Sequence, residues 1–313
     1  RIYFRLLKLN QFLMIEIIDI QTSLGSIKEK NADIEDLVGW AASEIQKKTG
    51  ISQRFISNDN ETTETLALDS FSKVSKKNNI KELDLIISVT NTPNYSFPTL
   101  GHYVHEHYEL NSPRIIGLNS GCSGFVDALL LLYNIFQSTQ INNGVIITSD
   151  TYSKFIDDTA RSTRTLFSDG ASSTYIEKNP NGMFLSDFTS SSLKNSFKSI
   201  AMTLEEQSIE MNGPKVLHFG LTKVIPELNS ILSGNENISI FAHQAGKIMF
   251  DAIESKLIGN HIVFKNFNHY GNLVSTSIPN LIKCNFLNFK ESDDLVLTGF
   301  GVGLTHTAMR LKR

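Results

Sequence analysis

The sequence has few cysteines, no long run of basic residues and no long apolar stretch. Two cysteines, Cys122 and Cys284, cannot build a disulfide framework and indicate no metal site, which favours a reducing, cytoplasmic compartment. The longest apolar run covers residues 128–133, far below the ~20 residues that cross a bilayer, so we expect no membrane segment. A net charge of -3, with acids and bases mixed along the chain, argues against a nucleic-acid partner.

The N-terminal residues differ in character from the rest of the chain. Residues 1–13 are basic and partly apolar, but they lack the sustained hydrophobic stretch and the cleavage site of a secretory signal. A strand-like run, MIEIIDI, begins at Met14. We therefore expect residues 1–13 to be an extension ahead of the folded chain.

Short apolar runs that are typical of strands alternate with helical stretches. Such alternation predicts an α/β protein, and strands that are apolar throughout, such as LIISV, predict a sheet covered on both faces. The expected strands are 83–90, 114–118, 144–148, 173–177, 238–242, 295–298 and 307–311. The expected helices are 31–48, 65–77, 123–138, 214–232, 246–257 and 274–283.

A break near residues 180–182 divides the chain into two halves of comparable plan. Each half ends in a glycine-bearing, hairpin-like segment: FSDGASSTYIE in the first and LTGFGVGLTHTAMRL in the second. This pattern predicts an internal duplication, with an N-terminal half over residues 14–180 and a C-terminal half over residues 181–313.

The segment GLNSGCSGFVDALLLLYNIF places Cys122 where an apolar, buried helix begins. Unpaired backbone N–H groups and the helix dipole favour a thiolate there, by about one pKa unit at most, so a nucleophile would need further activation. The alternative is a small residue at a tight helix–sheet contact, and this segment alone leaves both interpretations open.

Two other segments hold polar side chains at positions where catalytic groups occur. His243, in FAHQAGK, comes directly after a predicted strand, and Asn272, in NHYGNLVSTSIP, opens a further helix after Gly271. An ordinary loop histidine and a plain helix N-cap are the alternatives. None of these signals is specific by itself.

Together the segments resemble β-ketoacyl–acyl-carrier-protein synthase III, a member of the thiolase superfamily. The resemblance runs from about Met14 to the C-terminus. It rests on ordered motifs, namely KTGISQRFI, SVTNTPNYSFP, GCSGF, RSTRTLFSDGASS, FAHQAGK, HYGNLVSTSIP and GFGVGLT. It implies a thiolase fold with duplicated βαβαβαββ halves in a five-layered α-β-α-β-α body, and a homodimer.

The resemblance also implies the chemistry, a decarboxylative Claisen condensation of an acyl thioester with a malonyl thioester. Cys122 would carry the acyl group, and His243 and Asn272 would complete a Cys–His–Asn triad that holds an enolate oxygen. Backbone N–H groups of Cys122 and Val302 would form a second oxyanion site, with valine where the family has glycine. Phe97 matches a residue that reaches toward the acyl pocket of a partner subunit.

The implied substrates are thioesters of coenzyme A or phosphopantetheine, and no tightly bound cofactor or metal is expected. Acyl-CoA or acyl carrier protein would donate the acyl group, and malonyl-acyl carrier protein would extend it. The family stacks a tryptophan and an arginine on adenine. Arg161 matches the arginine, but Glu44 takes the place of the tryptophan, and Trp40, one helical turn earlier, is either a substitute or simple core.

A second departure lies just beyond His243. The family usually has Asn-x-Arg at the third and fifth positions beyond this histidine, where this chain has Gly246 and Ile248 with Lys247 between them. We therefore expect altered contacts to the pantetheine arm and the carrier protein, with Lys247 and Lys48 available to attract an acidic carrier. This departure is compatible with a specialised pathway.

Several other functions compete with condensation. An acyltransferase would pass the acyl group of Cys122 to an alcohol or amine, but such enzymes often lack the asparagine, so Asn272 favours condensation. A degradative thiolase would need a second cysteine where Thr298 and Gly299 stand. A non-catalytic subunit of a heterodimeric synthase would be expected to lose the nucleophile or its histidine. A nucleotide-binding protein would have a Walker loop or GxGxxG, and neither motif is present.

Overall fold

A computed structural model describes residues 13–313 except 81, 204, 233 and 236. The extension expected at residues 1–13 therefore lies outside the described residues, apart from Leu13. The backbone carbonyl of Leu13 accepts a hydrogen bond of 2.7 Å from the hydroxyl of Tyr133, so the chain is anchored to the body just before its first strand.

The first half builds a mixed five-stranded sheet. Its strands are β1 (Ile15–Leu24), β4 (Leu85–Val89), β5 (Arg114–Leu118), β6 (Asn143–Asp150) and β7 (Gly170–Lys178), in the order β1-β7-β6-β4-β5. All five residues of β4 are buried, as its largely apolar sequence predicts for a strand covered on both faces.

The second half repeats this topology. Its strands are β8 (Phe184–Ser192), β11 (Ser239–Ala242), β12 (Ile262–Phe264), β13 (Asp294–Gly301) and β14 (Thr305–Lys312), in the order β12-β11-β13-β14-β8. When the strands are numbered within each half, both sheets have the order 3-2-4-5-1. The predicted duplication of βαβαβαββ units is thereby confirmed. The division at residues 180 and 181 stays a prediction; the connection from β7 to β8 runs over residues 179–183.

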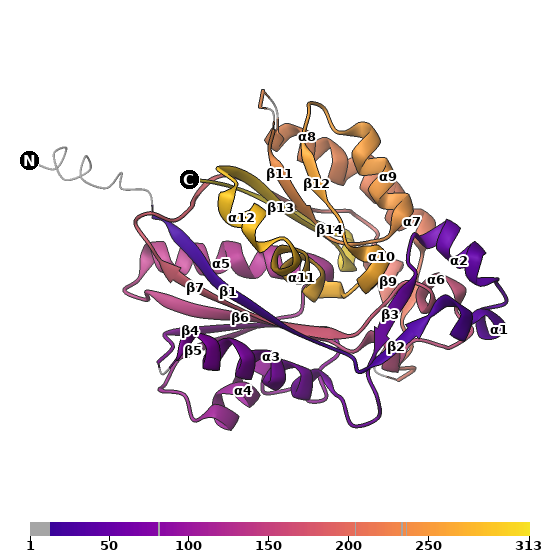
Figure 1. The fold of residues 1–313 in the computed structure, drawn as a ribbon, viewed down its shortest axis with the longest axis horizontal. Coiled ribbons are helices and arrows are strands. Elements are labelled where there is room, and N and C mark those ends of the chain that lie inside the picture. The colour runs from indigo at the N-terminus through magenta and orange to yellow at the C-terminus, as the bar shows by residue number, and fades with distance from the viewer. Residues whose placement is uncertain (1–12, 81, 204, 233, 236) are drawn as a thin grey trace, which may run out of the picture.

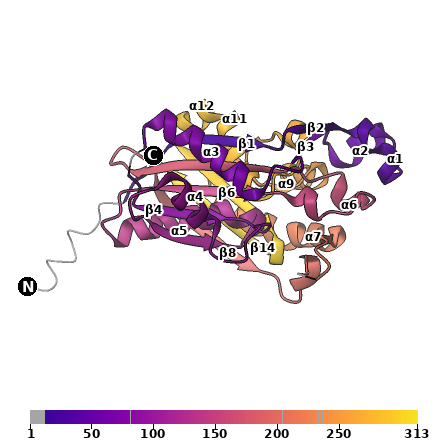
Figure 2. The ribbon, with the colours of Figure 1, turned by 90° about the horizontal axis from the view of Figure 1, so that it is seen from below.

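Helices form three layers around the two sheets (Figures 1 and 2). Helices α3 (Thr63–Asn78) and α4 (Leu100–Tyr108) cover the outer face of the first sheet. Helices α5 (Gly124–Ser138) and α11 (Ser277–Cys284) lie between the sheets, and α8 (Ile225–Leu232) and α9 (Lys247–Lys256) pack outside the second sheet. The five-layered thiolase fold is thus as predicted. Helix α5 is apolar nearly all round because it contacts both sheets.

Two predicted helices are interrupted. The helix expected at 31–48 consists of a 3-10 turn over Asn31–Asp33, α1 (Glu35–Val38) and α2 (Ala42–Thr49), because Gly39 ends α1 with a φ of 62°. The helix expected at 214–232 consists of α7 (Gly213–Phe219), a π-helical turn over Gly220–Val224, and α8. Pro226, which has no N–H to donate, comes just after this turn.

Several elements were not predicted from the sequence. Strand β8, FLSDFTSSS, is rich in serine and lies at the edge of its sheet, so it lacks the apolar signal of a buried strand. The other unpredicted elements are α4 and the shorter elements β12, β2 (Ile27–Lys30), β3 (Gln53–Ile56), β9 (Ile200–Ala201), β10 (Glu210–Met211), α6 (Arg161–Arg164), α10 (Phe267–Tyr270) and α12 (Phe286–Glu291).

A buried ionic network joins the β2–β3 hairpin to α6. The carboxylate of Glu29 accepts hydrogen bonds from Arg54 Nε at 3.0 Å and from Arg164 Nη1 at 2.6 Å. Arg54 is fully buried and also donates to Asn31 Oδ1 at 2.9 Å. Because two guanidinium groups share one carboxylate, Glu29 fixes α6, which begins at Arg161, against the hairpin.

Replacing Glu29 with glutamine should destabilise the protein by about 3–5 kcal/mol, because it leaves the buried Arg54 without its counter-charge and Arg164 with only the exposed carboxylate of Asp158. Urea unfolding, compared with a Glu44→Gln variant whose carboxylate pairs with Lys48 at the surface, measures the difference. The exposed pair should contribute at most about 1 kcal/mol. Equal losses in the two variants would contradict this role for Glu29.

Candidate active site

Cys122 lies in a 3-10 turn, Gly121–Ser123, that leads directly into α5. Its side chain is only 5% exposed. The end of β13 packs against this turn: a Cβ atom added at Gly301 would lie 2.8 Å from Cys122 Sγ, and one added at Gly299 would lie 2.7 Å from Ser123 Cα. Both positions therefore need glycine, and the GFGVG segment lies directly against the candidate nucleophile.

Burial raises the pKa of the Cys122 thiol to about 12, and the nearby carboxylate of Asp150 adds to this rise. The backbone N–H groups of Val302 and of Cys122 itself act in the opposite direction. The N–H contribution expected from the sequence is thus present, but the cost of desolvating a thiolate is larger. Cys122 is therefore a thiol at neutral pH.

Val302 stands where the family resemblance has glycine, and its backbone is not strained there. The left-handed backbone conformations in this loop belong to Gly303, with a φ of 71°, and Leu304, with a φ of 44°, whereas Val302 is not among the residues with positive φ. Its side chain packs close to Gly121, since a Cβ atom there would lie 2.7 Å from Val302 Cγ2. The valine therefore leaves the backbone N–H free to face the sulfur and adds a methyl group beside the nucleophile's turn.

His243 is the first residue after β11. Its backbone N–H donates to the carbonyl of Thr298 on β13 at 2.8 Å, and its ring lies edge-on to Phe300 at 5.5 Å between ring centres. The side chain is 2% exposed, and burial lowers the pKa of its imidazole to about 3. His243 Nδ1 is buried without a hydrogen-bond partner in the described part of the chain. The ring is therefore a neutral imidazole at physiological pH.

A neutral buried histidine makes stability depend on pH. The pKa of His243 falls from 6.5 to about 3 on folding, so the unfolded chain binds this proton more tightly and stability is lost as pH falls below 6.5. Between pH 7 and pH 5 the loss through His243 should be about 2 kcal/mol. Urea unfolding at both pH values should show a smaller loss for His243→Gln, since other titrating groups cancel in the comparison. Equal losses would contradict a neutral ring.

Asn272 lies between α10 and the 3-10 turn Val274–Thr276 that leads into α11. Its backbone N–H donates to Leu166 O at 2.9 Å, and its carbonyl accepts from Ser168 N–H at 2.9 Å. Its side-chain Oδ1 accepts the N–H of Val274 at 2.9 Å, a bond of the helix-capping type. Because Oδ1 is occupied, the orientation of the amide is fixed. Among the described residues, no group accepts a hydrogen bond from Asn272 Nδ2.

These segments converge on one region. Cys122 and Val274 belong to one buried apolar cluster, together with Tyr152 and Phe167. Phe167 in turn forms a β-bridge with Asn272. On the other side, β13 contacts the turn of Cys122 through its glycines and pairs with β11, which ends just before His243. Three side chains far apart in sequence thus sit on neighbouring segments, each at most 5% exposed.

Trp40 and Arg161 also lie together. The guanidinium carbon of Arg161 is 5.6 Å from the centre of the Trp40 ring, and Lys48 Nζ is 4.7 Å from it. The Trp40 side chain is partly buried against a small cluster of Ile34, Val38 and Ile45. Trp40 thus packs on this cluster while two cations lie over its ring, and both interpretations of Trp40 stay open.

A groove runs between α2 and α9, beside this tryptophan. Its lining includes the basic side chains of Lys47, Lys48 and Lys247, and Lys247 forms an ion pair of 2.5 Å with Asp251. Gly246 begins α9 with a φ of 98°, and a Cβ atom there would lie 3.3 Å from the carbonyl of Thr49. The lining of the groove holds three lysines against the two carboxylates of Glu44 and Asp251, so it is basic on balance, and Gly246 is closely packed at the start of the neighbouring helix.

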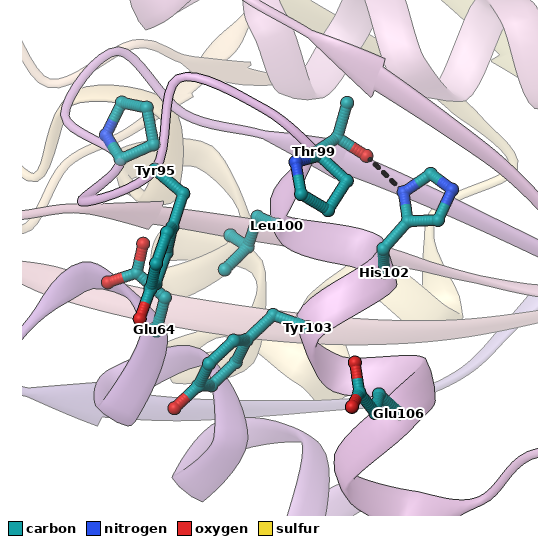
Figure 3. A pocket seen from close by; sticks show the side chains of 9 residues that line it. Glu64, Tyr95, Thr99, Leu100, His102, Tyr103 and Glu106 are labelled. Atoms are coloured by element: carbon teal, nitrogen blue, oxygen red, sulfur yellow. Dashed lines mark hydrogen bonds between the residues drawn. The ribbon is translucent and has the colours of Figure 1, made fainter.

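Phe97 lies in the loop before α4 and is 85% exposed. The same loop and α4 enclose a pocket in which Tyr95 and Tyr103 approach one another, with ring centres 6.2 Å apart (Figure 3). Glu64, from α3, lies behind Tyr95, and one of its oxygens accepts the N–H of Asn94 at 2.8 Å. This surface therefore presents several aromatic side chains to the outside.

Sequence reasoning missed Asp150 and Tyr152, which pack beside Cys122. Asp150 ends the buried strand β6, and a charged residue at the carboxyl end of a buried strand is a signal that could have identified it. Among residues 13–80, 82–203, 205–232, 234–235 and 237–313, no group of acidic, histidine and cysteine side chains could hold a metal ion, and no helix is long and apolar enough to span a bilayer.

Comparisons with known proteins agree with this architecture. Profiles of 3-oxoacyl-[acyl-carrier-protein] synthase III and of its C-terminal region match residues 116–192 and 234–313. A β-ketoacyl-[acyl-carrier-protein] synthase III of Staphylococcus aureus is 30% identical over 295 residues, with 90% of this chain and 93% of that protein covered. One of Streptococcus agalactiae is 29% identical over 305 residues, with 90% of this chain and 94% of that protein covered.

Among solved structures, a 3-oxoacyl-[acyl-carrier-protein] synthase III of Aquifex aeolicus superposes with a TM-score of 0.87 at 25% identity, covering 96% of this chain and all of that one (100%). The likeness extends over nearly the whole chain. The chain therefore belongs to the 3-oxoacyl-[acyl-carrier-protein] synthase III family, whose members are acyl-transferring condensing enzymes of the thiolase fold.

Proposed function

We propose that this protein condenses an acyl group carried on Cys122 with a malonyl thioester, releasing CO₂ and a 3-oxoacyl thioester. The observation that carries the proposal is the buried Cys122 thiol, with the N–H of Val302 at its sulfur and two glycines of β13 against its turn. A glycine-lined approach of this kind leaves room for the carbonyl carbon of a thioester next to a backbone donor.

In the first step the sulfur of Cys122 attacks the acyl thioester. The new carbon–sulfur bond replaces the bond to the donor thiol, and the thiol proton of Cys122 leaves with that donor. The backbone N–H groups of Cys122 and Val302 hold the negative oxygen of the tetrahedral intermediate. Since the Cys122 thiol has a pKa of about 12, attack and proton transfer are coupled, and no resting thiolate is needed.

In the second step the malonyl thioester loses CO₂, and the electron pair of the broken carbon–carbon bond forms an enolate. His243 Nε2–H and Asn272 Nδ2–H donate to the enolate oxygen. A neutral imidazole suits this role, because it stabilises the oxyanion without protonating it fully. The enolate carbon attacks the acyl group on Cys122, and collapse of that intermediate returns Cys122 to the thiol after protonation.

The thioester arm is proposed to enter over Trp40 and Arg161, along the groove that holds Lys47, Lys48 and Lys247. Stacking on the indole and guanidinium groups suits an adenine, and the lysines suit the phosphates of coenzyme A or an acidic acyl carrier protein. In this proposal no cofactor is held permanently. The two free cysteines, Cys122 and Cys284, support a cytoplasmic location.

A homodimer is part of the proposal. Phe97 is 85% exposed, and Tyr95 and Tyr103 add aromatic surface beside it (Figure 3). An exposed group of aromatic side chains is typical of a surface that a partner covers. Phe97 would then line the acyl pocket of the second copy, so the dimer would help to set which acyl groups fit.

Intact-mass spectrometry tests the proposed reaction. Purified protein is incubated with acyl thioesters of increasing length, and Cys122 should gain the mass of one acyl group. Addition of malonyl thioester should then discharge Cys122, with equal amounts of CO₂ and 3-oxoacyl product. Discharge by an alcohol or amine, with no release of CO₂, would instead support acyl transfer. A protein that is never acylated would refute both reactions.

A further inference from the structure

Asp150 is a buried acidic residue whose carboxylate acts on the Cys122 thiol, and the proposed mechanism gives this carboxylate no role. Asp150 ends β6 and has no exposed surface. Its Oδ1 accepts the N–H of Asn91 at 2.8 Å, and its Oδ2 accepts the hydroxyl of Ser275 in a short bond. Among the described residues, Asp150 forms no ion pair with a lysine, arginine or histidine, and its hydrogen-bond partners are all neutral. A buried, unpaired carboxylate is costly, so its position calls for an explanation.

The partners of Asp150 lie on the two segments that flank the reactive groups. Ser275 is three residues beyond Asn272, in the turn that also fixes the Asn272 amide through Val274. The side chain of Asn91 lies against the Cys122 turn: a Cβ atom added at Gly121 would be 2.5 Å from Asn91 Oδ1. Asn91 Oδ1 also accepts the hydroxyl of Tyr152 at 3.0 Å. One carboxylate therefore links both segments.

We propose that Asp150 is a positioning residue, which braces the segment of Asn272 against the loop after β4 that places Asn91 at the Cys122 turn, and whose negative charge adds to the effect of burial in disfavouring a thiolate at Cys122. The second part rests on the position of Asp150, which bonds the backbone of Asn91 while the Asn91 side chain lies against the Cys122 turn, because a carboxylate near a buried sulfur opposes a second negative charge. Cys122 and Tyr152 are the titratable groups on which Asp150 acts. A protected thiol reacts with a bound thioester but resists alkylation and oxidation while the site is empty.

Two substitutions at Asp150 separate the effect of its negative charge from the effect of its hydrogen bonds to Asn91 and Ser275. Asp150→Asn removes the charge. It retains an oxygen that accepts the N–H of Asn91, and its amide N–H can donate to the hydroxyl oxygen of Ser275. Asp150→Ala removes both. Asp169→Asn is the matched control, because Asp169 is also fully buried, is held by Ser57 and Ser153, and does not act on the Cys122 thiol.

The charge is tested by alkylation, which needs no substrate. In a Cys284→Ser background, the rate at which iodoacetamide modifies Cys122 is measured by intact mass between pH 7 and 10. Asp150→Asn should react about three- to tenfold faster at pH 8, as expected for a lower thiol pKa. Asp169→Asn should match the parent. A profile of Asp150→Asn that superimposes on the parent, or an equal shift in Asp169→Asn, would overturn this part.

The brace rests on the proposed function and is tested by CO₂ release from malonyl thioester. Asp150→Asn should release CO₂ within about twofold of the parent, and Asp150→Ala about tenfold more slowly, with acylation of Cys122 retained in both. If Asp150→Ala does not fold, Ser275→Ala replaces it, because it breaks the same link. Equal rates for the alanine and asparagine variants would overturn the brace. If the parent releases no CO₂, the proposed function fails, but the alkylation result still stands.

Discussion

Replacing Cys122 with serine should abolish acyl loading and reduce condensation by about 10⁴-fold or more. A serine hydroxyl is a far weaker nucleophile than a thiol, and neighbouring groups supply no strong base, because the His243 imidazole has a pKa of about 3. Intact mass after incubation with an acyl thioester should show no added acyl group. The rate of product formation from malonyl thioester gives the second measurement.

Cys284→Ser is the matched control for this change. Cys284 is an exposed, free cysteine at the end of α11, so its replacement removes the second thiol without touching the buried site. This variant should load one acyl group and condense at the rate of the parent. A Cys122→Ser protein that still loads an acyl group rapidly, or a Cys284→Ser protein that no longer does, would place the nucleophile elsewhere.

Much of the fold could be predicted because its signals are local. Strand β4 is apolar except for Ser88, and helix α5 is apolar nearly all round, so both sequences indicate burial between layers. The errors have equally local causes. Gly39 ends α1 in a left-handed conformation within an otherwise helical pattern, and β8 is a serine-rich edge strand without the apolar signal of a buried strand.

The site was less accessible to pattern reasoning, because its members come together only through tertiary structure. His243 and Asn272 are separately ordinary for a loop and a helix start, and ordered motifs of a resemblance, not spacing, singled them out. The high thiol pKa of Cys122 could not be predicted, since desolvation and the Asp150 charge arise only once the layers pack. Trp40 and Arg161 are 121 residues apart, yet cation and ring meet at 5.6 Å.

Replacing Asn272 with alanine should slow decarboxylation and condensation by about 10²–10³-fold, the usual cost of one oxyanion donor. Acyl loading of Cys122 should persist, because the backbone N–H groups of Cys122 and Val302 serve that step. Radiolabelled CO₂ release measures the loss, and intact mass measures loading. Asn280, a buried asparagine in α11, provides the control for a general loss of packing. Asn280→Ala should leave both rates within about threefold of those of the parent.

The double variant His243→Ala/Asn272→Ala shows whether the two donors serve one oxygen. If both hold the same enolate, removing the first already costs most of the stabilisation, so the double variant should lose much less than the product of the single losses. Losses that multiply fully would mean that His243 and Asn272 act in separate steps. Loss of acyl loading in Asn272→Ala would move that residue from the enolate to the first oxyanion, and the proposed division of labour would then be wrong.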